Sequence, residues 1–393
     1  MATQYALIDK DTLKLIRETR NVSFEYAARI TKYDSSKIMC WEDSQNVTRP
    51  TIRQAKDLAR CYRIPFAGLY MIPQYVPVEK LPKILNKRKI WGAIEEDNSA
   101  LNLAIFDLLR LRKIVLDTKA ELGEPIEHFT FSGNLNDAVV LAGQLRKYLG
   151  ISYEMQKATS SHRKLFLLVR SKVEQKGTMV AGFEKVELEV ARGISLYFDD
   201  IPIIGVNDDD RPPAKTFSII HELVHIFKRT STMCNEINSF SSDVEEVFCN
   251  AVAGEFLVPA LFLEKEPEVV NQNDIDDHAI EVISTRYSVS REVIIRRLLD
   301  LGYLQRPFFE EKMEQYKIER EKEKEEQKIA SKNGQSTFRR SVPRDTFDKN
   351  GSSVCESLYN GFNQGIYSQW DVSNFLGVKP IHIPKLFEEV IRW

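Results

Sequence analysis

The stretch FSIIHELVHIF at residues 217–227 decides how the central part of the chain folds. His221 and His225 are four residues apart, so on an α-helix both imidazoles project from one side, about one turn apart. Two nitrogens placed in this way can bind one zinc ion, and Glu222 can act as a general base towards water activated there. The neighbouring residues are apolar and predict a buried helix. Because buried polar groups need partners, the two histidines either bind a metal or are hydrogen-bonded core residues in a chance HExxH match.

A second helix, predicted at residues 244–257, offers a third ligand. Catalytic zinc takes three protein ligands, and Glu246 is our choice because Asn250 follows it by four residues on the same face. Asn250 could hydrogen-bond a ligand imidazole and hold its tautomer. Glu245 is the alternative ligand, Glu255 is a weaker one, and either first-turn carboxylate could simply favour the positive end of the helix dipole.

Length and composition limit the number of domains and the classes of protein that this chain can represent. The chain has 393 residues, 43% of them hydrophobic and 28% charged, and a net charge of −2. A length of this order predicts two or three domains, and the charge argues against a nucleic-acid coat while allowing one local basic module. The sequence contains neither a long apolar run nor a signal peptide, and its five cysteines form no CxxC, so we expect a cytoplasmic protein with free thiols and no membrane span.

Residues 12–72 predict five short helices. Apolar residues recur at helical spacing, and Ser23, Asp34 or Ser35, and Thr51 suit helix N-caps. The segment resembles the XRE/Cro-repressor family of helix-turn-helix domains, and the resemblance is most specific where Ile38, Trp41 and Glu42 are followed by Pro50 and Thr51. It implies a recognition helix at about residues 35–42.

The predicted DNA contacts come from this helix and from one residue beyond it. They are Ser35, Ser36, Lys37, Met39, Cys40 and Arg49. Residues 1–75 hold 12 Lys and Arg against 8 Asp and Glu, a net charge of +4 that suits phosphate contacts. Lys37 is the one strong base-edge donor in the recognition helix. The alternative is a helical module used for protein contacts or dimerisation.

Along residues 76–206 the spacing of apolar residues changes from the period of helices to that of strands. Prolines and a basic run at residues 83–89 predict a connector, followed by helices at 100–121 and 135–149. Apolar or alternating runs at residues 165–169, 186–190, 194–198 and 201–206 predict strands of a small, mostly antiparallel sheet. We expect residues 194–206 to form a free sheet edge that binds substrate as an added strand.

Several motifs between residues 192 and 259 occur in a family-like order. They are Arg192-Gly193-Ile194, Pro202 with Val206-Asn207, the HELVH stretch, and Glu246 with Cys249-Asn250 and Phe256-Leu257-Val258-Pro259. Together they resemble the ImmA/IrrE family of zinc metallopeptidases, whose members cleave or inactivate partner repressors and are often fused behind an XRE domain. The resemblance implies zinc on His221, His225 and Glu246, with Glu222 as the base. It names no transition-state stabiliser, for which His278 and Tyr197 are candidates.

Beyond Pro259 the sequence predicts only helices. A helical pair at about residues 280–303 either packs on the peptidase core or binds a partner, and it begins its second helix at Ser290. Residues 310–332 carry opposite charges at i,i+4 spacing, which is typical of a solvated helix running into a Gly334–Ser336 linker. Residues 338–393 predict a helical module for partner binding or oligomerisation, with a core of Val354, Leu358, Phe362, Ile366, Trp370, Val372, Phe375 and Leu376.

The predicted protein is multidomain and mainly α, with an α+β zincin-like core, an N-terminal five-helix domain and a C-terminal helical module. The expected boundaries are 1–75, 76–130, 131–305, 306–337 and 338–393. We expect a DNA-binding regulator whose first domain binds its operator as a homodimer. Its zinc endopeptidase is expected to cleave a partner repressor or toxin in a stress, mobile-element or toxin–antitoxin setting. The competing hypothesis is an antitoxin or repressor that binds a partner toxin and its own operator without cleaving anything.

Overall fold

The computed structural model describes residues 4–76, 81–82, 84–86, 97–126, 128–234, 243–270, 275–332 and 341–392. The chain divides into two compact units. The first unit comprises Met1–Lys83, Ile90–Leu111 and Phe183–Val190, and the second comprises Ile84–Lys89, Arg112–Gly182 and Ala191–Trp393. Helix α5 (Ser99–Leu122) contributes residues to both. The finer boundaries predicted from the sequence stay predictions.

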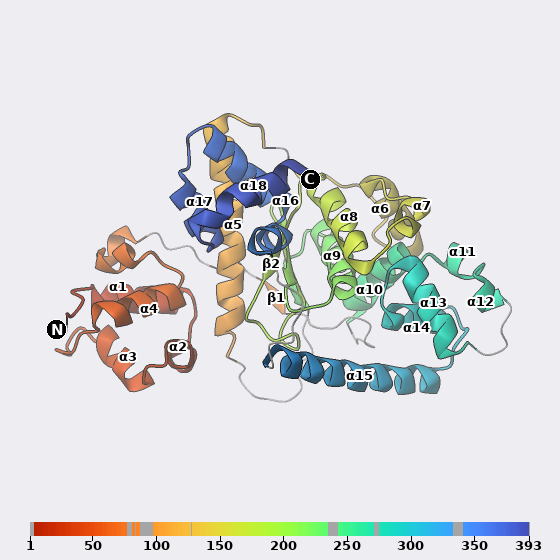
Figure 1. Cartoon of the computed structure of the whole chain (residues 1–393), viewed down its shortest axis with the longest axis horizontal. Coiled ribbons are helices and arrows are strands. Elements are labelled where there is room, and N and C mark those ends of the chain that lie inside the picture. Colours follow the sequence, from red (N-terminus) through yellow and green to blue (C-terminus); the bar gives the residue numbers. More distant parts are fainter. Residues whose placement is uncertain are drawn as a thin grey trace. The chain divides into compact units, whose positions relative to one another are not determined.

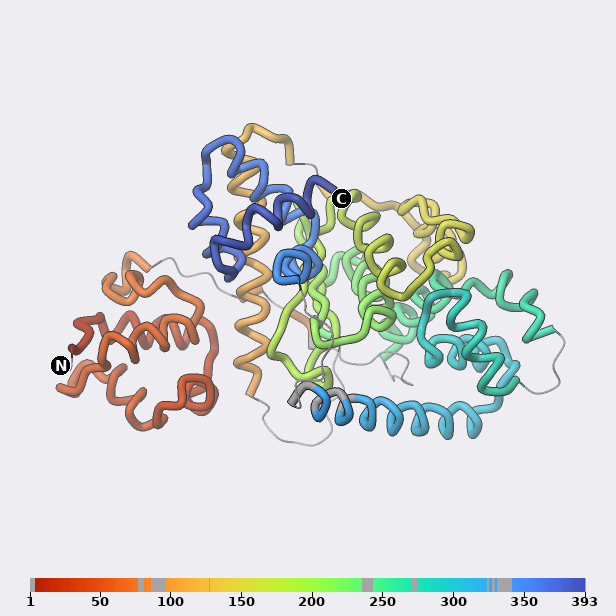
Figure 2. Tube along the Cα trace, viewed as in Figure 1, coloured from red at the N-terminus to blue at the C-terminus, as the bar shows by residue number. Residues whose placement is uncertain are grey.

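The first unit is a bundle of short helices, as its spacing predicts. Its elements are α1 (Lys10–Thr19), α2 (Phe24–Thr31), α3 (Ser35–Glu42), α4 (Ile52–Cys61) and the 3₁₀ helices η1 (Phe66–Tyr70) and η2 (Pro73–Tyr75). Ser23, Asp34 and Thr51 accept backbone N–H groups at the starts of α2, α3 and α4, so these three N-caps are confirmed. The trace of the four α-helices can be followed in Figure 2.

One buried ion pair ties the bundle together. The Nε of Arg17 in α1 lies 2.9 and 3.0 Å from the two carboxylate oxygens of Glu42 at the end of α3. Burial raises the pKa of Glu42, although Arg17 opposes that shift. The arginine also stacks over the ring of Phe24 in α2, 3.9 Å from its centroid, so a single side chain connects three helices.

The second unit is built on a five-stranded sheet. The strands are β1 (Leu85–Asn86), β2 (Met179–Phe183), β3 (Gly193–Leu196), β4 (Ile203–Asn207) and β5 (Thr232–Cys234), in the order β1-β5-β3-β4-β2. Strand β3 pairs antiparallel with both β4 and β5, whereas β1 pairs parallel with β5.

Three helices pack together beside the central strands. They are α8 (His162–Glu174), α9 (Pro212–Phe227) and α10 (Val244–Leu257), and α9 contacts both of the others as well as β3 and β4 (Figure 1). The remaining helices of this part are α6 (Ala138–Leu149), α7 (Tyr153–Lys157), α11 (Ala260–Leu263), α12 (Pro267–Val270), α13 (Asp277–Tyr287) and α14 (Arg291–Asp300). Ser290 caps α14 as predicted.

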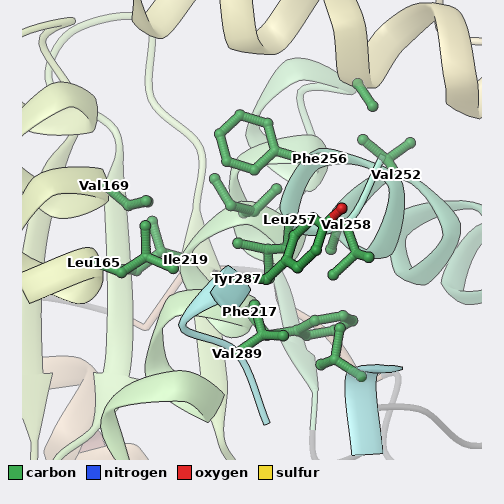
Figure 3. Packing of buried hydrophobic residues seen from close by; sticks show 14 of the residues in the cluster. Leu165, Val169, Phe217, Ile219, Val252, Phe256, Leu257, Val258, Tyr287 and Val289 are labelled. Carbon is green, nitrogen blue, oxygen red and sulfur yellow. The ribbon is translucent and has the colours of Figure 1, made fainter. Parts of the chain in front are cut away.

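One continuous apolar cluster joins these helices. Figure 3 shows Ile219 of α9 beside Leu165 and Val169 of α8, and Phe217 of α9 and Val252 and Phe256 of α10 belong to the same cluster. Each of these side chains is at most 1% exposed. A core of this density holds α9 rigidly, and α9 carries the HELVH stretch.

Two strand predictions and the prediction of a free sheet edge are wrong. Residues 165–169 belong to α8, because the run LFLLV lies within a capped amphipathic helix, and a short apolar run does not distinguish a buried strand from a buried helix. Residues 186–190 form bends and turns. Residues 194–206 are not a free edge, because β3 lies between β5 and β4, and β4 lies between β3 and β2.

The C-terminal part is helical, as expected. It comprises α15 (Arg306–Lys332), α16 (Val342–Asn363), α17 (Gln369–Leu376), η3 (Pro380–His382) and α18 (Ile383–Arg392). Val354, Leu358 and Val372 are fully buried, but the predicted core residue Trp370 is 67% exposed and Phe362 is 37% exposed. The predicted linker at 334–336 and most of the basic run at 83–89 lie outside the described residues. Within the described parts of the chain, no helix combines the length and apolarity that a membrane span requires.

Candidate metal centre

Helix α9 places its two histidines deep in the second unit. Two prolines, Pro212 and Pro213, occupy its first turn, where a missing N–H is tolerated. Every residue from 216 to 227 is buried. His221 is 3% exposed and His225 is fully buried, so neither imidazole can satisfy its nitrogens with bulk water.

Glu246 from α10 meets both histidines. Its Oε2 lies 3.1 Å from Nε2 of His221, and its Oε1 lies 3.2 Å from Nε2 of His225. The two Nε2 atoms are themselves 3.2 Å apart. Donor atoms bound at 2.0–2.1 Å to a tetrahedral ion would be separated by about 3.3 Å, which is close to the separation of the two nitrogens and to the distance from each nitrogen to one oxygen of Glu246.

The polar atoms of this cluster face one another at close range. Nε2 of His221 faces both Nε2 of His225 and a carboxylate oxygen, and all three atoms present lone pairs when each neutral imidazole carries its proton on Nδ1. Oε1 of Glu246 is buried and accepts no hydrogen bond from any described residue, although Nε2 of His225 is close to it. In that tautomer three lone pairs converge, an arrangement that suits a divalent cation.

A fourth donor, Cys234, completes the group. The ligand-type atoms of His221, His225, Cys234 and Glu246 all lie within 4.8 Å of one another, and all four residues are buried. Its Sγ is 3.8 Å from Nε2 of His225. This cluster could hold a metal ion, and its His and carboxylate donors fit zinc.

In both Glu246 and His225, burial and the neighbouring groups shift the pKa in opposite directions. Burial alone would raise the pKa of Glu246, but His221 and His225 hold it well below its usual range. Burial alone would lower the pKa of His225, but the thiols of Cys234 and Cys249 and the Glu245 carboxylate raise it well above its usual range. Without a cation, Glu246 and an imidazolium would partner each other. A divalent ion would replace that proton.

Glu222 is held beside the cluster by the sheet. It is 1% exposed, and its Oε2 accepts a hydrogen bond from Oγ1 of Thr232 in β5 at 3.2 Å. Thr232 is in turn 2.6 Å from the hydroxyl of Ser195 in β3. Burial raises the pKa of Glu222. Its carboxyl group packs against Gly193, where a Cβ would lie only 2.9 Å from the Glu222 Cδ and Cγ atoms.

The alternative ligand, Glu245, lies on the other side of His225. Its Oε1 is 3.8 Å from Nδ1 of His225 and 3.7 Å from Nζ of Lys228. Sγ of Cys249 lies 3.9 Å from the same Nδ1. Glu246 therefore lies close to the Nε2 atoms of both histidines, which face the cluster. Glu245 lies close to Nδ1 of His225, on the opposite side of that ring.

Other sequence candidates have different surroundings. Oδ1 of Asn250 is buried without a hydrogen-bond partner among the described residues, as is Nδ1 of His221, and Asn250 makes no hydrogen bond to either imidazole there. Glu255 pairs with buried Arg297 and accepts the N–H of Ala260, so it stabilises the end of α10. Neither candidate for a transition-state stabiliser contacts the cluster through a hydrogen bond among the described residues. The Tyr197 hydroxyl donates to Asp199 at 2.7 Å, and His278 is exposed at the start of α13.

The predicted DNA-contact residues belong to α3 and the segment after it. Ser36, Lys37, Met39 and Arg49 are exposed, and Ser35 and Cys40 are partly exposed. Helix α3 thus exposes most of its predicted contact residues, while Ile38 and Trp41 are buried in the bundle. Contact with DNA stays a prediction.

The sequence reading missed the contributions of β5 and β3. The sequence pattern places Cys234 among five scattered thiols and singles out neither Thr232 nor Ser195. Cys234 follows His225 by nine residues, and no local spacing connects them. The pairing of Thr232 with Ser195 and of Cys234 with Gly193 brings these residues to the cluster.

Comparison with protein families agrees with the geometry of this region. The comparison with curated proteins and the comparison with solved structures each gave no significant match. Residues 182–299 match the family model of the IrrE N-terminal-like domain, Peptidase_M78. The matched range contains β3, β4, α9, β5 and α10, and with them every residue of the cluster. The family consists of metallopeptidases, so this region of the chain is similar to a metallopeptidase domain.

Proposed function

We propose that this chain is a regulator in which the second unit is a zinc-dependent endopeptidase and the first unit binds operator DNA. The observation that carries the peptidase proposal is the mutual spacing of His221, His225 and Glu246, at 3.1–3.2 Å, with the Glu222 carboxylate beside them. The match of residues 182–299 to a peptidase family supports the same reaction. We expect the substrate to be a partner regulatory protein in a stress, mobile-element or toxin–antitoxin setting.

The residues have separate roles in this reaction. His221, His225 and Glu246 would hold zinc, which when bound lowers the pKa of water and polarises a carbonyl group. Glu222 takes a proton from the attacking water and returns it to the leaving amine, as a general acid–base residue does. Thr232 holds one oxygen of Glu222, so the other oxygen remains for that proton.

The test is co-expression of the full chain with the product of the neighbouring gene. We expect the wild-type chain to cleave that partner and Glu222→Gln to cleave it about 10²–10⁴ times more slowly at unchanged zinc content. Glu264→Gln, which changes an exposed carboxylate outside the cluster, is the matched control. Mass analysis of the partner gives the cleavage site. Undiminished cleavage by Glu222→Gln would refute the mechanism, and a purified chain without zinc would refute the site.

One observation favours a second candidate function, a non-proteolytic antitoxin or repressor. Strand β1 pairs along β5, and the N–H of Leu85 donates to the carbonyl of Ser231 at 2.9 Å. The chain's own segment therefore occupies the outer side of the strand that carries Thr232 and Cys234. The same experiment distinguishes the two candidates, because a scaffold would bind its partner intact and Glu222→Gln would bind it equally well.

A further inference from the structure

Cys234 is the one thiol in the candidate metal cluster formed by the described residues. Its Sγ lies 3.8 Å from Nε2 of His225 and belongs to the same group of ligand-type atoms as His221 and Glu246. A thiolate bound at about 2.3 Å and an imidazole bound at about 2.0 Å to one tetrahedral ion would be separated by about 3.6 Å. The observed separation from His225 is close to this value, and Sγ lies within 4.8 Å of the ligand-type atoms of His221 and Glu246.

The backbone of Cys234 leaves its side chain little freedom. It pairs antiparallel with Gly193 of β3, and its carbonyl accepts the N–H of Arg192 at 2.9 Å. The residue is 4% exposed. The thiol is therefore held at the cluster by the sheet, and solvent does not compete for it.

The position of the thiol is next to the general base. Oγ1 of Thr232 lies 3.2 Å from Oε2 of Glu222 and 4.0 Å from Sγ of Cys234. The cluster also contains the orphaned Oε1 of Glu246, a carboxylate oxygen of a residue only 5% exposed. Among the described residues this oxygen accepts no well-aligned hydrogen bond, although Nε2 of His225 lies 3.2 Å from it, and such a buried acceptor suits a cation among these four side chains.

We propose that Cys234 is a fourth protein ligand, so that the resting chain holds its metal in a closed His₂GluCys set. On binding, the Cys234 thiol loses its proton to solvent and the sulfur coordinates as the thiolate. This inference rests on the proposed metal site. It has a consequence for the proposed peptidase: a tetrahedral site with four protein ligands is closed, so water enters beside Glu222 only after the sulfur has moved away.

The alternative to a metal ligand is that the buried Cys234 thiol only donates a weak hydrogen bond to His225. Cys249 provides the comparison within the same chain, because its Sγ lies 3.9 Å from the other nitrogen of His225, outside the group of ligand-type atoms. Both thiols are buried, and both contact the same imidazole. Only Cys234 lies on the side where the ion would be.

The test is X-ray absorption spectroscopy on the zinc-loaded full chain, together with optical spectra of the cobalt(II)-substituted chain. We expect one sulfur neighbour at about 2.3 Å from zinc, beside nitrogen and oxygen neighbours at about 2.0–2.2 Å. The cobalt form should show a thiolate-to-cobalt charge-transfer band. Cys234→Ser, or Cys234→Ala if the serine variant does not fold, should lose both signals, whereas Cys249→Ser should keep both.

The outcomes separate the two proposals. A zinc spectrum with only nitrogen and oxygen neighbours would overturn the assignment of Cys234 and leave the His-His-Glu site intact. Retention of the sulfur signal in Cys234→Ser, or its loss in Cys249→Ser alone, would also overturn it. Failure of the wild-type chain to bind either zinc or cobalt would refute the proposed metal site and the fourth ligand with it.

Discussion

At the scale of the residue, the candidate base depends on the absence of a side chain opposite it. The Glu222 carboxyl group packs against the Cα of Gly193, and a Cβ at that position would lie 2.9 Å from the Glu222 Cδ and Cγ atoms. Contacts of that length are shorter than carbon atoms tolerate, so the carboxyl group would have to move. Because Thr232 holds the same carboxylate from β5, the base lies between two strands that fix it from different directions.

We predict that Gly193→Ala abolishes most cleavage without removing the metal. A displacement of a catalytic group by about 1 Å can cost roughly 10²-fold in rate, and the added methyl group requires a movement of this order. Partner cleavage and zinc content of the purified chain measure the two effects. Gly143→Ala in α6 is the control, because a Cβ there meets no atom within 4 Å. Cleavage at the wild-type rate by Gly193→Ala would show that Glu222 is not placed by this contact.

At the scale of the element, helix α3 is short and is fixed at both ends. Asp34 caps its first turn, and Nζ of Lys10 donates to the carbonyl groups of Cys40, Asp43 and Asn46 at and beyond its last turn, at 3.4, 3.1 and 2.6 Å. A cation at a helix C-terminus satisfies carbonyl groups that have no partner within the helix. The exposed side of α3 is thus held in place by contacts made on its buried side.

We predict that Lys37→Ala weakens binding to the DNA upstream of the chain's own gene. Removal of one phosphate-binding lysine should reduce the slope of log affinity against log salt by about 1, and removal of a base contact should cost about 1–3 kcal/mol. Binding titrations at several salt concentrations measure both. Lys147→Ala, which removes one exposed positive charge from α6, should leave the slope unchanged. An unchanged slope for Lys37→Ala would favour the alternative, a module for protein contacts.

At the scale of the whole molecule, a buried polar network attaches the C-terminal helices to α8. Arg170 donates to the carbonyl groups of Asp348, Lys349 and Val180, and the Glu174 carboxylate accepts the N–H and the hydroxyl of Ser352 at 3.1 and 2.9 Å. Arg170 and Glu174 are 3.7 Å apart and almost fully buried. Burial raises the pKa of Glu174, although Arg170 opposes that shift.

The helix bends where it meets this network. Gly351 has φ +82° inside α16, and a Cβ there would lie 2.6 Å from the Val180 carbonyl oxygen and overlap the Arg170 and Glu174 side chains. A residue with a side chain could adopt neither this backbone conformation nor this close approach without strain. The kink therefore turns the backbone of α16 towards the buried arginine and carboxylate.

We predict that Arg170→Ala lowers the free energy of unfolding by about 3–5 kcal/mol, because it leaves the Glu174 carboxylate buried without its cation. Urea denaturation of the full chain measures the loss. Arg163→Ala breaks the ion pair between Arg163 and Asp348, which is partly exposed, and should cost no more than about 1 kcal/mol. If the two variants were equally stable, the buried pair would contribute no more to attachment than a surface pair.

The sequence by itself determined the features that depend on neighbours along the chain. Helical spacing predicted α1 to α4, α5, α9, α10 and α14, and the caps at Ser23, Asp34, Thr51 and Ser290 lie where the side chains suggested. The spacing of His221 and His225 predicted that both would lie on one helical face, because one turn of an α-helix relates positions four residues apart.

Only the tertiary structure decided what lies opposite those faces. Strand pairing brings Thr232 and Cys234 to α9, closes both sides of β3 and β4, and makes β1 the neighbour of β5. The run LFLLV became helical because it packs on α9 as part of α8, and Trp370 stayed exposed although its pattern predicted burial. Strand register and packing partners are determined by contacts between segments far apart in the sequence, so the local spacing of residues does not predict them.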